Sequence, residues 1–197
     1  WDKVQLADVT HAAHALGMLT HLDGARLWNA AAASGSTESE LAAGFDTISV
    51  CLSKGLGAPA GSVIAGTREV IKRCHRLRKM HGGGMRQVGV LAAAGLYAIE
   101  HHRTRLVEDH ANAHALAVAL VNANNLTVDL PNIHTNIVMI DIIKGNADAV
   151  IGVARQDGIL LGSAGPQRVR VVTHLDVDRD GVMRAAKVIA DIASTLA

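Results

Sequence analysis

A single lysine, Lys54, stands between an apolar stretch, residues 47–52, and a glycine-rich stretch with Gly55, Gly57 and Gly61. The apolar stretch predicts a buried strand, and a lysine at the end of such a strand is costly unless its amine has a function. Burial would favour the uncharged amine, which is a nucleophile toward carbonyl compounds. A lysine in an exposed turn is the alternative, because most lysines in proteins are exposed.

An aspartate, Asp23, follows another short apolar stretch, residues 19–22, which predicts a second strand. Parallel α/β sheets bind their ligands beyond the carboxyl ends of the strands, so we expect Asp23 and Lys54 at one sheet edge. A lysine that forms a Schiff base and an aspartate that keeps a ring nitrogen protonated would suit pyridoxal phosphate chemistry. The spacing alone does not select this cofactor, because many α/β proteins carry an aspartate and a lysine at strand ends.

The composition indicates the class of fold. Of the 197 residues, 49% are hydrophobic but only 2% are aromatic, so the core must consist mainly of alanine, valine, leucine and isoleucine. This composition is typical of α/β layers, in which aliphatic strands are buried between alanine-rich helices. The net charge of +1 argues against a nucleic-acid partner. The apolar stretches are too short to span a membrane, so we expect no membrane partner.

Two cysteines, Cys51 and Cys74, have neither the spacing of a disulfide framework nor that of a metal site. This pattern indicates a reduced, cytoplasmic protein. No cluster of histidine, cysteine and acidic residues has metal-ligand spacing, so we expect no transition metal. The chain also begins at Trp1 without an initiating methionine, and we expect a further segment upstream of it.

The hydrophobic pattern predicts two domains. Residues 1–122 form strand-and-helix layers of a larger α/β domain that ends in a long bridging helix, and residues 123–197 form a small α+β domain. Thr37 and Asp178 are expected to cap helices, with Glu40 completing a capping box. The expected helices are 4–16, 27–33, 38–43, 67–80, 85–100, 103–123, 147–157 and 178–196, and the expected strands are 19–22, 47–52, 62–65, 127–130, 137–142, 159–161 and 167–173.

Four segments carry a family resemblance: HLDGARLWNA (21–30), CLSKGLGAPAGS (51–62), RLRKMHGGGMRQVGVLAAAGLYAI (76–99) and VRVVTHLDV (169–177). They closely resemble low-specificity L-threonine aldolases, and the resemblance extends from about Leu19 to the C-terminus. Such enzymes have the aspartate-aminotransferase-like fold of pyridoxal phosphate proteins, known as fold type I. The resemblance therefore implies part of a fold type I large domain, with a mostly parallel sheet, followed by the small α+β domain.

The resemblance implies a site for pyridoxal 5'-phosphate. Lys54 would form the Schiff base, and Asp23 would pair with the pyridine nitrogen. Ser53 would help to hold the phosphate. Lys79 and Arg86, which flank three consecutive glycines, would approach the phosphate, often from a neighbouring subunit. A solvated charge for Lys79 and a helix-end residue for Arg86 are the alternatives.

The resemblance also implies a site for an amino-acid substrate. Arg26, in DGAR, and Arg170, in VRVVTH, would bind the α-carboxylate through the rigid guanidinium fork. Surface ion pairs are the alternative for both arginines. His21 could pack beside the cofactor, and His174 could orient Arg170. Other histidines on predicted helices are expected to pack or to face solvent: His101, His102, His110 and His114.

The implied activity is the cleavage of L-threonine, L-allo-threonine and related β-hydroxy amino acids to glycine and an aldehyde, in a homotetramer. The N-terminal part of a family member, with its phosphate-binding loop and active-site histidines, has no counterpart here. We therefore expect this chain alone to bind the cofactor weakly. Two other hypotheses remain open: another fold type I lyase that catalyses β-elimination, and a truncated structural subunit without activity.

Overall fold

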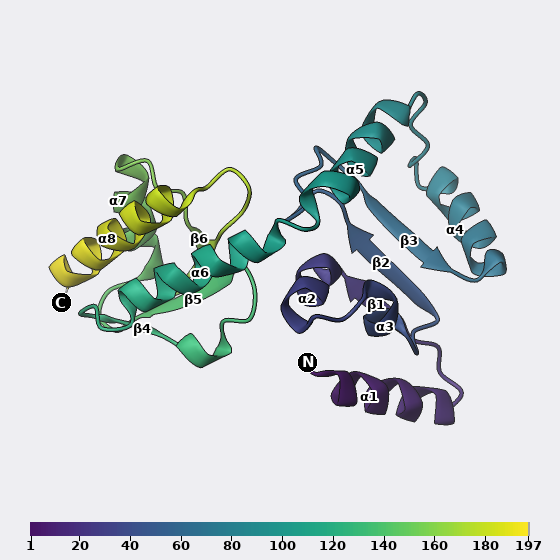
Figure 1. Ribbon diagram of the computed structural model, residues 1–197, viewed down its shortest axis with the longest axis horizontal. Coiled ribbons are helices and arrows are strands. Elements are labelled where there is room, and N and C mark those ends of the chain that lie inside the picture. The colour runs from purple at the N-terminus through teal and green to yellow at the C-terminus, as the bar shows by residue number, and fades with distance from the viewer. Residues whose placement is uncertain (197) are drawn as a thin grey trace. The chain divides into compact units, whose positions relative to one another are not determined.

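The computed structural model describes residues 1–196 and divides the chain into two compact units, Trp1–Thr104 and a second that begins at Arg105 (Figure 1). The boundary predicted from the sequence lies later, at residue 122, because the hydrophobic pattern places the long helix in the first domain as a bridge. In the structure this helix, α6 (Leu106–Leu120), belongs to the second unit. Its buried side chains join the core of that unit, where they pack on α8 and β5.

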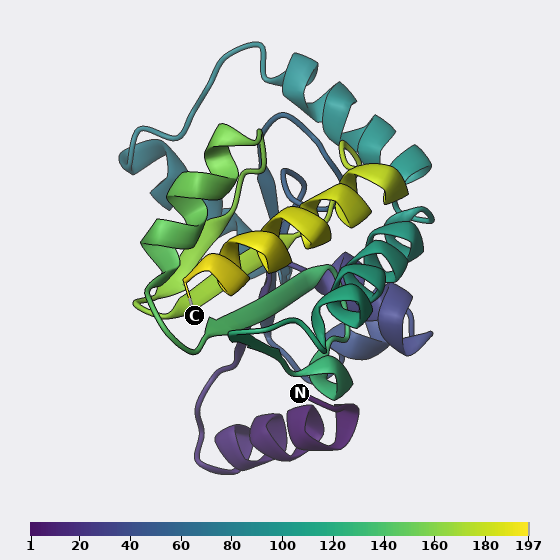
Figure 2. The ribbon, with the colours of Figure 1, turned by 90° about the vertical axis from the view of Figure 1, so that its left-hand side faces the viewer.

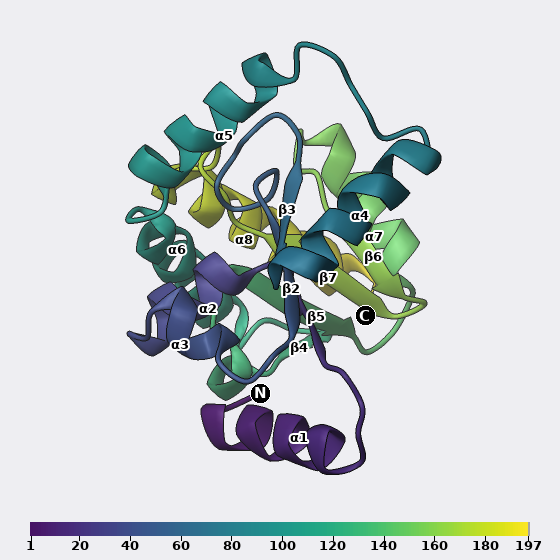
Figure 3. The same ribbon diagram turned by 90° about the vertical axis from the view of Figure 1, so that its right-hand side faces the viewer.

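The first unit is built on a three-stranded sheet in the order β1-β2-β3 (Figure 1), of which Figure 3 shows β2 and β3 edge-on. The strands are β1 (His21–Gly24), β2 (Thr47–Cys51) and β3 (Ser62–Gly66). β1 and β2 are parallel, with Asp23 beside Ser49, whereas β3 runs antiparallel to β2. The carboxyl ends of β1 and β2 therefore lie at the same edge of the sheet.

Helices cover one face of this sheet. Leu27 and Leu41, from α2 and α3, pack against Leu22 of β1 and Val50 of β2. α5 begins later than predicted, because Gln87 has a left-handed backbone conformation (φ 53°) that an α-helix does not accommodate. The helices of this unit are α1 (Lys3–Ala15), α2 (Leu27–Ser34), α3 (Glu38–Ala42), α4 (Arg68–Met80) and α5 (Gly89–His102).

The second unit is an antiparallel sheet in the order β4-β5-β7-β6, with α6, α7 and α8 on one face (Figure 2). Alternation along the strands sends Val138, Ile140 and Val169 into the core beneath the helices, whereas Arg170 faces the other side. The predicted strand at 159–161 is replaced by β6. The further elements are β4 (Leu126–Val128), a 3₁₀ turn (Leu130–Asn132), β5 (Ile137–Ile142), α7 (Ala147–Gln156), β6 (Gly162–Gly165), β7 (Arg168–Val172) and α8 (Arg179–Thr195).

Candidate functional site

The face of the first sheet opposite α2 and α3 is polar. Because side chains alternate along a strand, His21 and Asp23 of β1 share this face with Thr47 and Ser49 of β2. His21 Nδ1 lies 2.8 Å from Thr47 Oγ1, and His21 Nε2 lies 3.3 Å from Ser49 Oγ. Both ring nitrogens are thus engaged by hydroxyl groups, which fixes the imidazole on the same face as Asp23.

Asp23 lies at the carboxyl end of β1, and its side chain is exposed. One carboxylate oxygen accepts a hydrogen bond from the Ala25 N–H at 3.1 Å, which closes the turn toward α2. Arg26, the half-buried residue that precedes α2, follows in the same turn. Asp23 and Arg26 both line an open pocket of about 260 Å³. Both residues of the DGAR segment therefore border one depression, whose lining also includes Leu22 and Leu27 from the face that α2 covers.

Trp28 ties α2 to the end of β2. Its indole N–H donates a hydrogen bond to the C=O of Cys51 at 3.0 Å. Cys51 is the last residue of β2, and α2 follows directly after Arg26. This hydrogen bond therefore holds the turn after β1 against the exit from β2, where the loop with Lys54 begins.

Lys54 lies in a loop, residues 52–61, whose backbone is fixed by its own hydrogen bonds. They fold the loop back on itself, so that the position of the Lys54 backbone is defined. The three bonds run from Leu52 N–H to Gly61 C=O (3.0 Å), from Ala58 N–H to Leu52 C=O (3.1 Å) and from Gly57 N–H to Lys54 C=O (2.8 Å).

The side chain of Lys54 is exposed, which corrects the expectation of a buried amine. The buried residues are its neighbours, Gly55 and Leu56, and only 1% of the Leu56 surface is exposed. The apolar sequence around the lysine therefore anchors the loop and does not cover the amine. Ser53 is exposed as well, and the side chains of Ser53 and Lys54 form no hydrogen bond or ion pair within residues 1–196.

Lys79 and Arg86 lie on either side of the three glycines. Lys79 is in the last turn of α4, and its side chain runs over Gly84, where an added Cβ would lie 3.3 Å from Lys79 Nζ. Arg86 is exposed in the turn before α5. No hydrogen bond or ion pair in the described part of the chain joins either side chain to Asp23 or Lys54. Their role at a phosphate therefore stays a prediction.

Two arginines of β7, Arg168 and Arg170, project from the same face of the second sheet but differ in their partners. Arg168 donates to Asp141 of β5 through Nε at 2.6 Å and Nη2 at 2.9 Å, and this hydrogen bonding lowers the pKa of Asp141 below its usual value. Arg170 has no ion-pair partner among the described residues, and its guanidinium lies over Gly162 of β6. Arg170 is therefore available for an external carboxylate.

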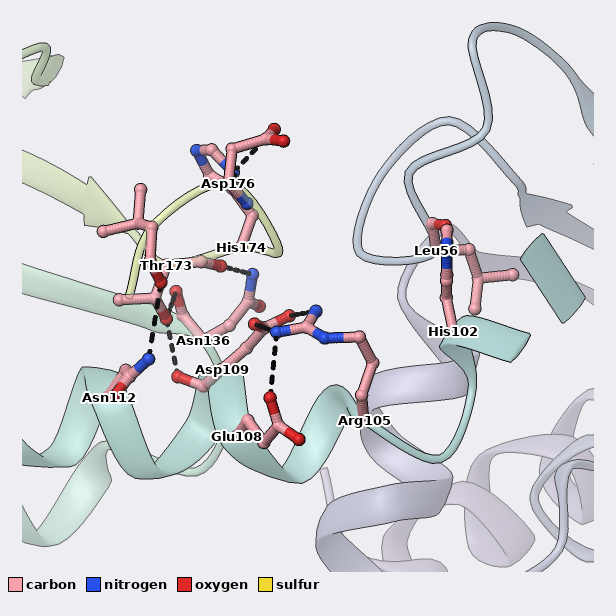
Figure 4. Close-up of polar contacts among 11 residues, drawn as sticks. Leu56, His102, Arg105, Glu108, Asp109, Asn112, Asn136, Thr173, His174 and Asp176 are labelled. Carbon is pink, nitrogen blue, oxygen red and sulfur yellow. Dashed lines mark hydrogen bonds and ion pairs between the residues drawn. The ribbon is translucent and has the colours of Figure 1, made fainter. Parts of the chain in front are cut away.

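A buried polar network fixes the end of β7 (Figure 4). Thr173 directly follows β7 and is 2% exposed. Its Oγ1 donates to the Asp109 C=O at 2.6 Å, and its own C=O accepts from Asn136 Nδ2 at 2.8 Å. The fully buried Asp109 carboxylate accepts from Arg105 Nη1 at 3.3 Å and Nη2 at 2.9 Å. Three residues after Arg170, the strand is thus held against α6.

The sequence did not reveal these contacts. Arg105 and Asp109 have the four-residue spacing of a helical ion pair, which could have indicated the pair but not its burial. His102 was expected to pack or to face solvent. In the structure its Nδ1 lies 2.7 Å from the C=O of Leu56, a residue 46 positions away, and no local pattern indicates such a distant partner.

Three further findings concern ligands and environment. None of the helices in residues 1–196 is long and apolar enough to cross a membrane. The same residues contain no group of histidine, cysteine and acidic side chains that could hold a metal ion. Cys51 and Cys74 are free cysteines.

Comparison with known proteins gives matches over most of the chain. Residues 2–143 match the beta-eliminating lyase family. The chain is 44% identical over 166 residues to a low specificity L-threonine aldolase of Escherichia coli O157:H7, covering 84% of this chain and 48% of that protein. It is 39% identical over 169 residues to low-specificity L-threonine aldolase 1 of Arabidopsis thaliana, covering 84% and 47%. The chain thus spans about half the length of the curated relatives it matches, and the predicted family is confirmed.

Solved structures show the same fold. A putative L-allo-threonine aldolase from Listeria monocytogenes aligns with a TM-score of 0.79 at 19% identity, covering 100% of this chain and 57% of that chain. A putative aromatic amino acid beta-eliminating lyase/threonine aldolase from Exiguobacterium sp. 255-15 aligns with a TM-score of 0.79 at 18% identity, covering 95% and 56%. At these identities the likeness concerns the fold alone. It confirms the predicted α/β fold class. This chain covers only part of each of these structures.

Proposed function

Because the chain belongs to the beta-eliminating lyase family, we propose that it supplies the lysine-bearing part of a pyridoxal 5'-phosphate-dependent lyase. The proposed reaction is the aldol cleavage of L-threonine, L-allo-threonine and related β-hydroxy amino acids to glycine and an aldehyde, as the names of the relatives suggest. One observation carries the proposal: Asp23 lies at the carboxyl end of β1, Lys54 follows the carboxyl end of β2, and these two strands are adjacent and parallel. This is the edge where α/β sheets bind their ligands.

The residues at this edge suit the cofactor. Lys54 carries an exposed amine on a loop with a defined backbone, and its uncharged form is the nucleophile for the aldehyde carbon of the cofactor. The exposed Asp23 carboxylate is the anion that would keep the pyridine nitrogen protonated. When bound, the cofactor would supply an electron sink for the breaking Cα–Cβ bond. Ser53, Lys79 and Arg86 are the proposed ligands of its phosphate.

Arg26 and Arg170 are the proposed ligands of the substrate α-carboxylate. Arg26 is half-buried beside Asp23 in the same pocket, and its side chain forms no ion pair within residues 1–196. Arg170 is likewise unpaired, whereas its neighbour Arg168 is neutralised by Asp141. A guanidinium without an internal partner can bind a carboxylate through two parallel hydrogen bonds.

We include a cytoplasmic homotetramer in the proposal. The apolar side chains of Val90, Leu96 and Tyr97 on α5 are exposed, and such a surface supports a contact with another subunit. The free cysteines support a reducing compartment. Analytical ultracentrifugation of the chain with and without pyridoxal 5'-phosphate tests the oligomeric state.

The arginines of β7 provide a matched test of the substrate site. Arg170→Ala should raise the KM for L-threonine by about 10- to 100-fold, which corresponds to losing a hydrogen-bonded charge pair. Arg168→Ala should leave the KM within about threefold, because Arg168 is already bound to Asp141. The assay is acetaldehyde release from L-threonine. Equal effects of the two substitutions would contradict the assignment of Arg170.

β-Elimination is the second candidate, because it is the reaction named in the description of the matching family. The products distinguish the two candidates. Aldol cleavage of L-threonine releases acetaldehyde and glycine, whereas β-elimination releases a keto acid and ammonia. A chain that forms neither set of products in the presence of pyridoxal 5'-phosphate would favour the structural-subunit hypothesis.

A further inference from the structure

The orientation of Lys54 depends on its loop. The exposed side chain has no hydrogen-bond or ion-pair partner within residues 1–196. Only the backbone of residues 52–61 therefore sets the position from which the Lys54 side chain extends. Whatever holds this loop therefore positions the amine. The inference below rests on the proposed function of Lys54.

α5 contacts the loop at two points, one on each side of Lys54. Before the lysine, Leu52 approaches Gly95 so closely that an added Cβ on the glycine would lie 2.9 Å from Leu52 Cδ1. After the lysine, the C=O of Leu56 lies 2.7 Å from His102 Nδ1 (Figure 4). Leu52 and Leu56 are each two residues from Lys54, so the two contacts bracket it.

The two contact residues lie on the buried side of α5. Gly95 and His102 are seven residues apart, which is about two helical turns and places them on one face. Ala98, between them on that face, is 1% exposed, whereas Leu96 and Tyr97 are exposed. The face of α5 that is buried in the first unit is therefore the face that meets the loop.

The hydrogen bond at Leu56 satisfies a buried acceptor. Leu56 is 1% exposed. Among the backbone hydrogen bonds of turns and loops in the described residues, none ends at the Leu56 carbonyl. Since a carbonyl only accepts, His102 must carry its proton on Nδ1. The ring of Tyr97 meets the imidazole edge-on at 5.5 Å, which restricts its rotation.

We propose that His102 is a positioning residue for Lys54. Its Nδ1–H holds the Leu56 carbonyl and thereby fixes the loop that presents the lysine amine to the aldehyde carbon of pyridoxal 5'-phosphate. His102 acts through the loop and makes no contact with the cofactor or the substrate.

Three variants of the whole chain test this role. His102→Phe keeps an aromatic ring beside Tyr97 but removes the donor, and His102→Asn restores a side-chain N–H. His101→Phe is the matched control. The ring centroids of His101 and Tyr97 lie 4.2 Å apart, but His101 is exposed and forms no hydrogen bond to the loop. The first measurement is amide hydrogen exchange across residues 52–61. The second is the rate at which pyridoxal 5'-phosphate, trapped by borohydride, attaches to Lys54.

We expect His102→Phe to speed exchange in the loop and to slow attachment at Lys54, each by about tenfold, as the loss of one ordinary hydrogen bond would do. His102→Asn and His101→Phe should stay within about twofold of the unaltered chain, because each retains a donor at the Leu56 carbonyl. Unchanged loop exchange in a folded His102→Phe chain would overturn the proposal. A different result would overturn the proposed function instead: His102→Phe speeds exchange in the loop, but the cofactor does not attach to Lys54 even in the unaltered chain. That result would still support the contact between His102 and the loop.

A measurement on the unaltered chain decides the question if His102→Phe does not fold. Long-range ¹H–¹⁵N NMR of the imidazole shows which ring nitrogen carries the proton when the ring is neutral. Protonated Nδ1 supports the bond to Leu56. Protonated Nε2 overturns it, because Nδ1 would then have no proton to donate.

Discussion

Replacing Asp109 by asparagine would remove the charge from a fully buried carboxylate in the second unit. This carboxylate accepts two hydrogen bonds from Arg105, whose side chain is 21% exposed. The amide keeps one acceptor oxygen and turns its NH₂ group toward the guanidinium, so one charged hydrogen bond is lost. Since hydrogen bonds to charged groups contribute about 1.5–3 kcal/mol, we expect Asp109→Asn to lower the free energy of unfolding by about 2–3 kcal/mol.

Urea unfolding with two probes measures this loss. Both tryptophans, Trp1 and Trp28, are in the first unit, so their fluorescence reports on that unit, whereas far-UV circular dichroism reports on the helices of both. With a slope of about 1–3 kcal/mol per molar urea, the loss corresponds to a fall of about 0.7–3 M in the midpoint seen by circular dichroism. The fluorescence midpoint should not move.

Glu108→Gln is the matched control in the same helical turn. Glu108 is 67% exposed and lies 3.5 Å from Arg105, and exposed ion pairs contribute little, so we expect a change below about 0.5 kcal/mol. Equal midpoints for Asp109→Asn and Glu108→Gln would refute the reasoning, because they would show that burial does not strengthen the bond between Asp109 and Arg105.

Two further predictions concern the first unit. Hydrogen bonds from Thr20 lower the pKa of Asp46 to about 2. The stability that this carboxylate contributes is therefore present above its ordinary pKa of 3.8 and is lost as the pH falls toward 2. Carboxyl ¹³C NMR should show the titration midpoint of Asp46 near 2, and a midpoint at the ordinary pKa would contradict these hydrogen bonds. Gly24→Ala places a Cβ 2.9 Å from the Ser49 backbone oxygen, and should lower the free energy of unfolding by about 1–3 kcal/mol in urea unfolding followed by tryptophan fluorescence. Gly89→Ala, which meets nothing within 4 Å, is its control and should not destabilise the unit.

Local sequence patterns predicted the elements that carry the candidate site. The apolar residues 47–52 correspond to β2, and Asp23 lies at the end of β1 as the pattern indicated. The caps at Thr37 and Asp178 are confirmed, because capping depends only on residues three positions apart. The family could also be identified from the residues of four motifs and from their order along the chain.

The contacts that hold the site in place could not be predicted in the same way. Thr173 bonds to Asp109 across 64 residues, and His102 bonds to Leu56 across 46, so neither pair has a local signal. The sequence also predicts a buried Lys54, whereas its side chain is exposed. Apolar neighbours predict that a segment is anchored, but they do not tell whether the polar residue among them points inward or outward.

The attachment site of pyridoxal 5'-phosphate tests the central role of Lys54 most directly. The chain has six lysines, all with exposed side chains: Lys3, Lys54, Lys72, Lys79, Lys144 and Lys187. Exposure alone therefore gives none of them an advantage. The chain would be incubated with less than one equivalent of the cofactor, reduced with borohydride and analysed by peptide mass spectrometry. We expect most of the label on Lys54, and loss of this preference in Asp23→Asn. An even distribution over the six lysines, unchanged by Asp23→Asn, would contradict the proposed site.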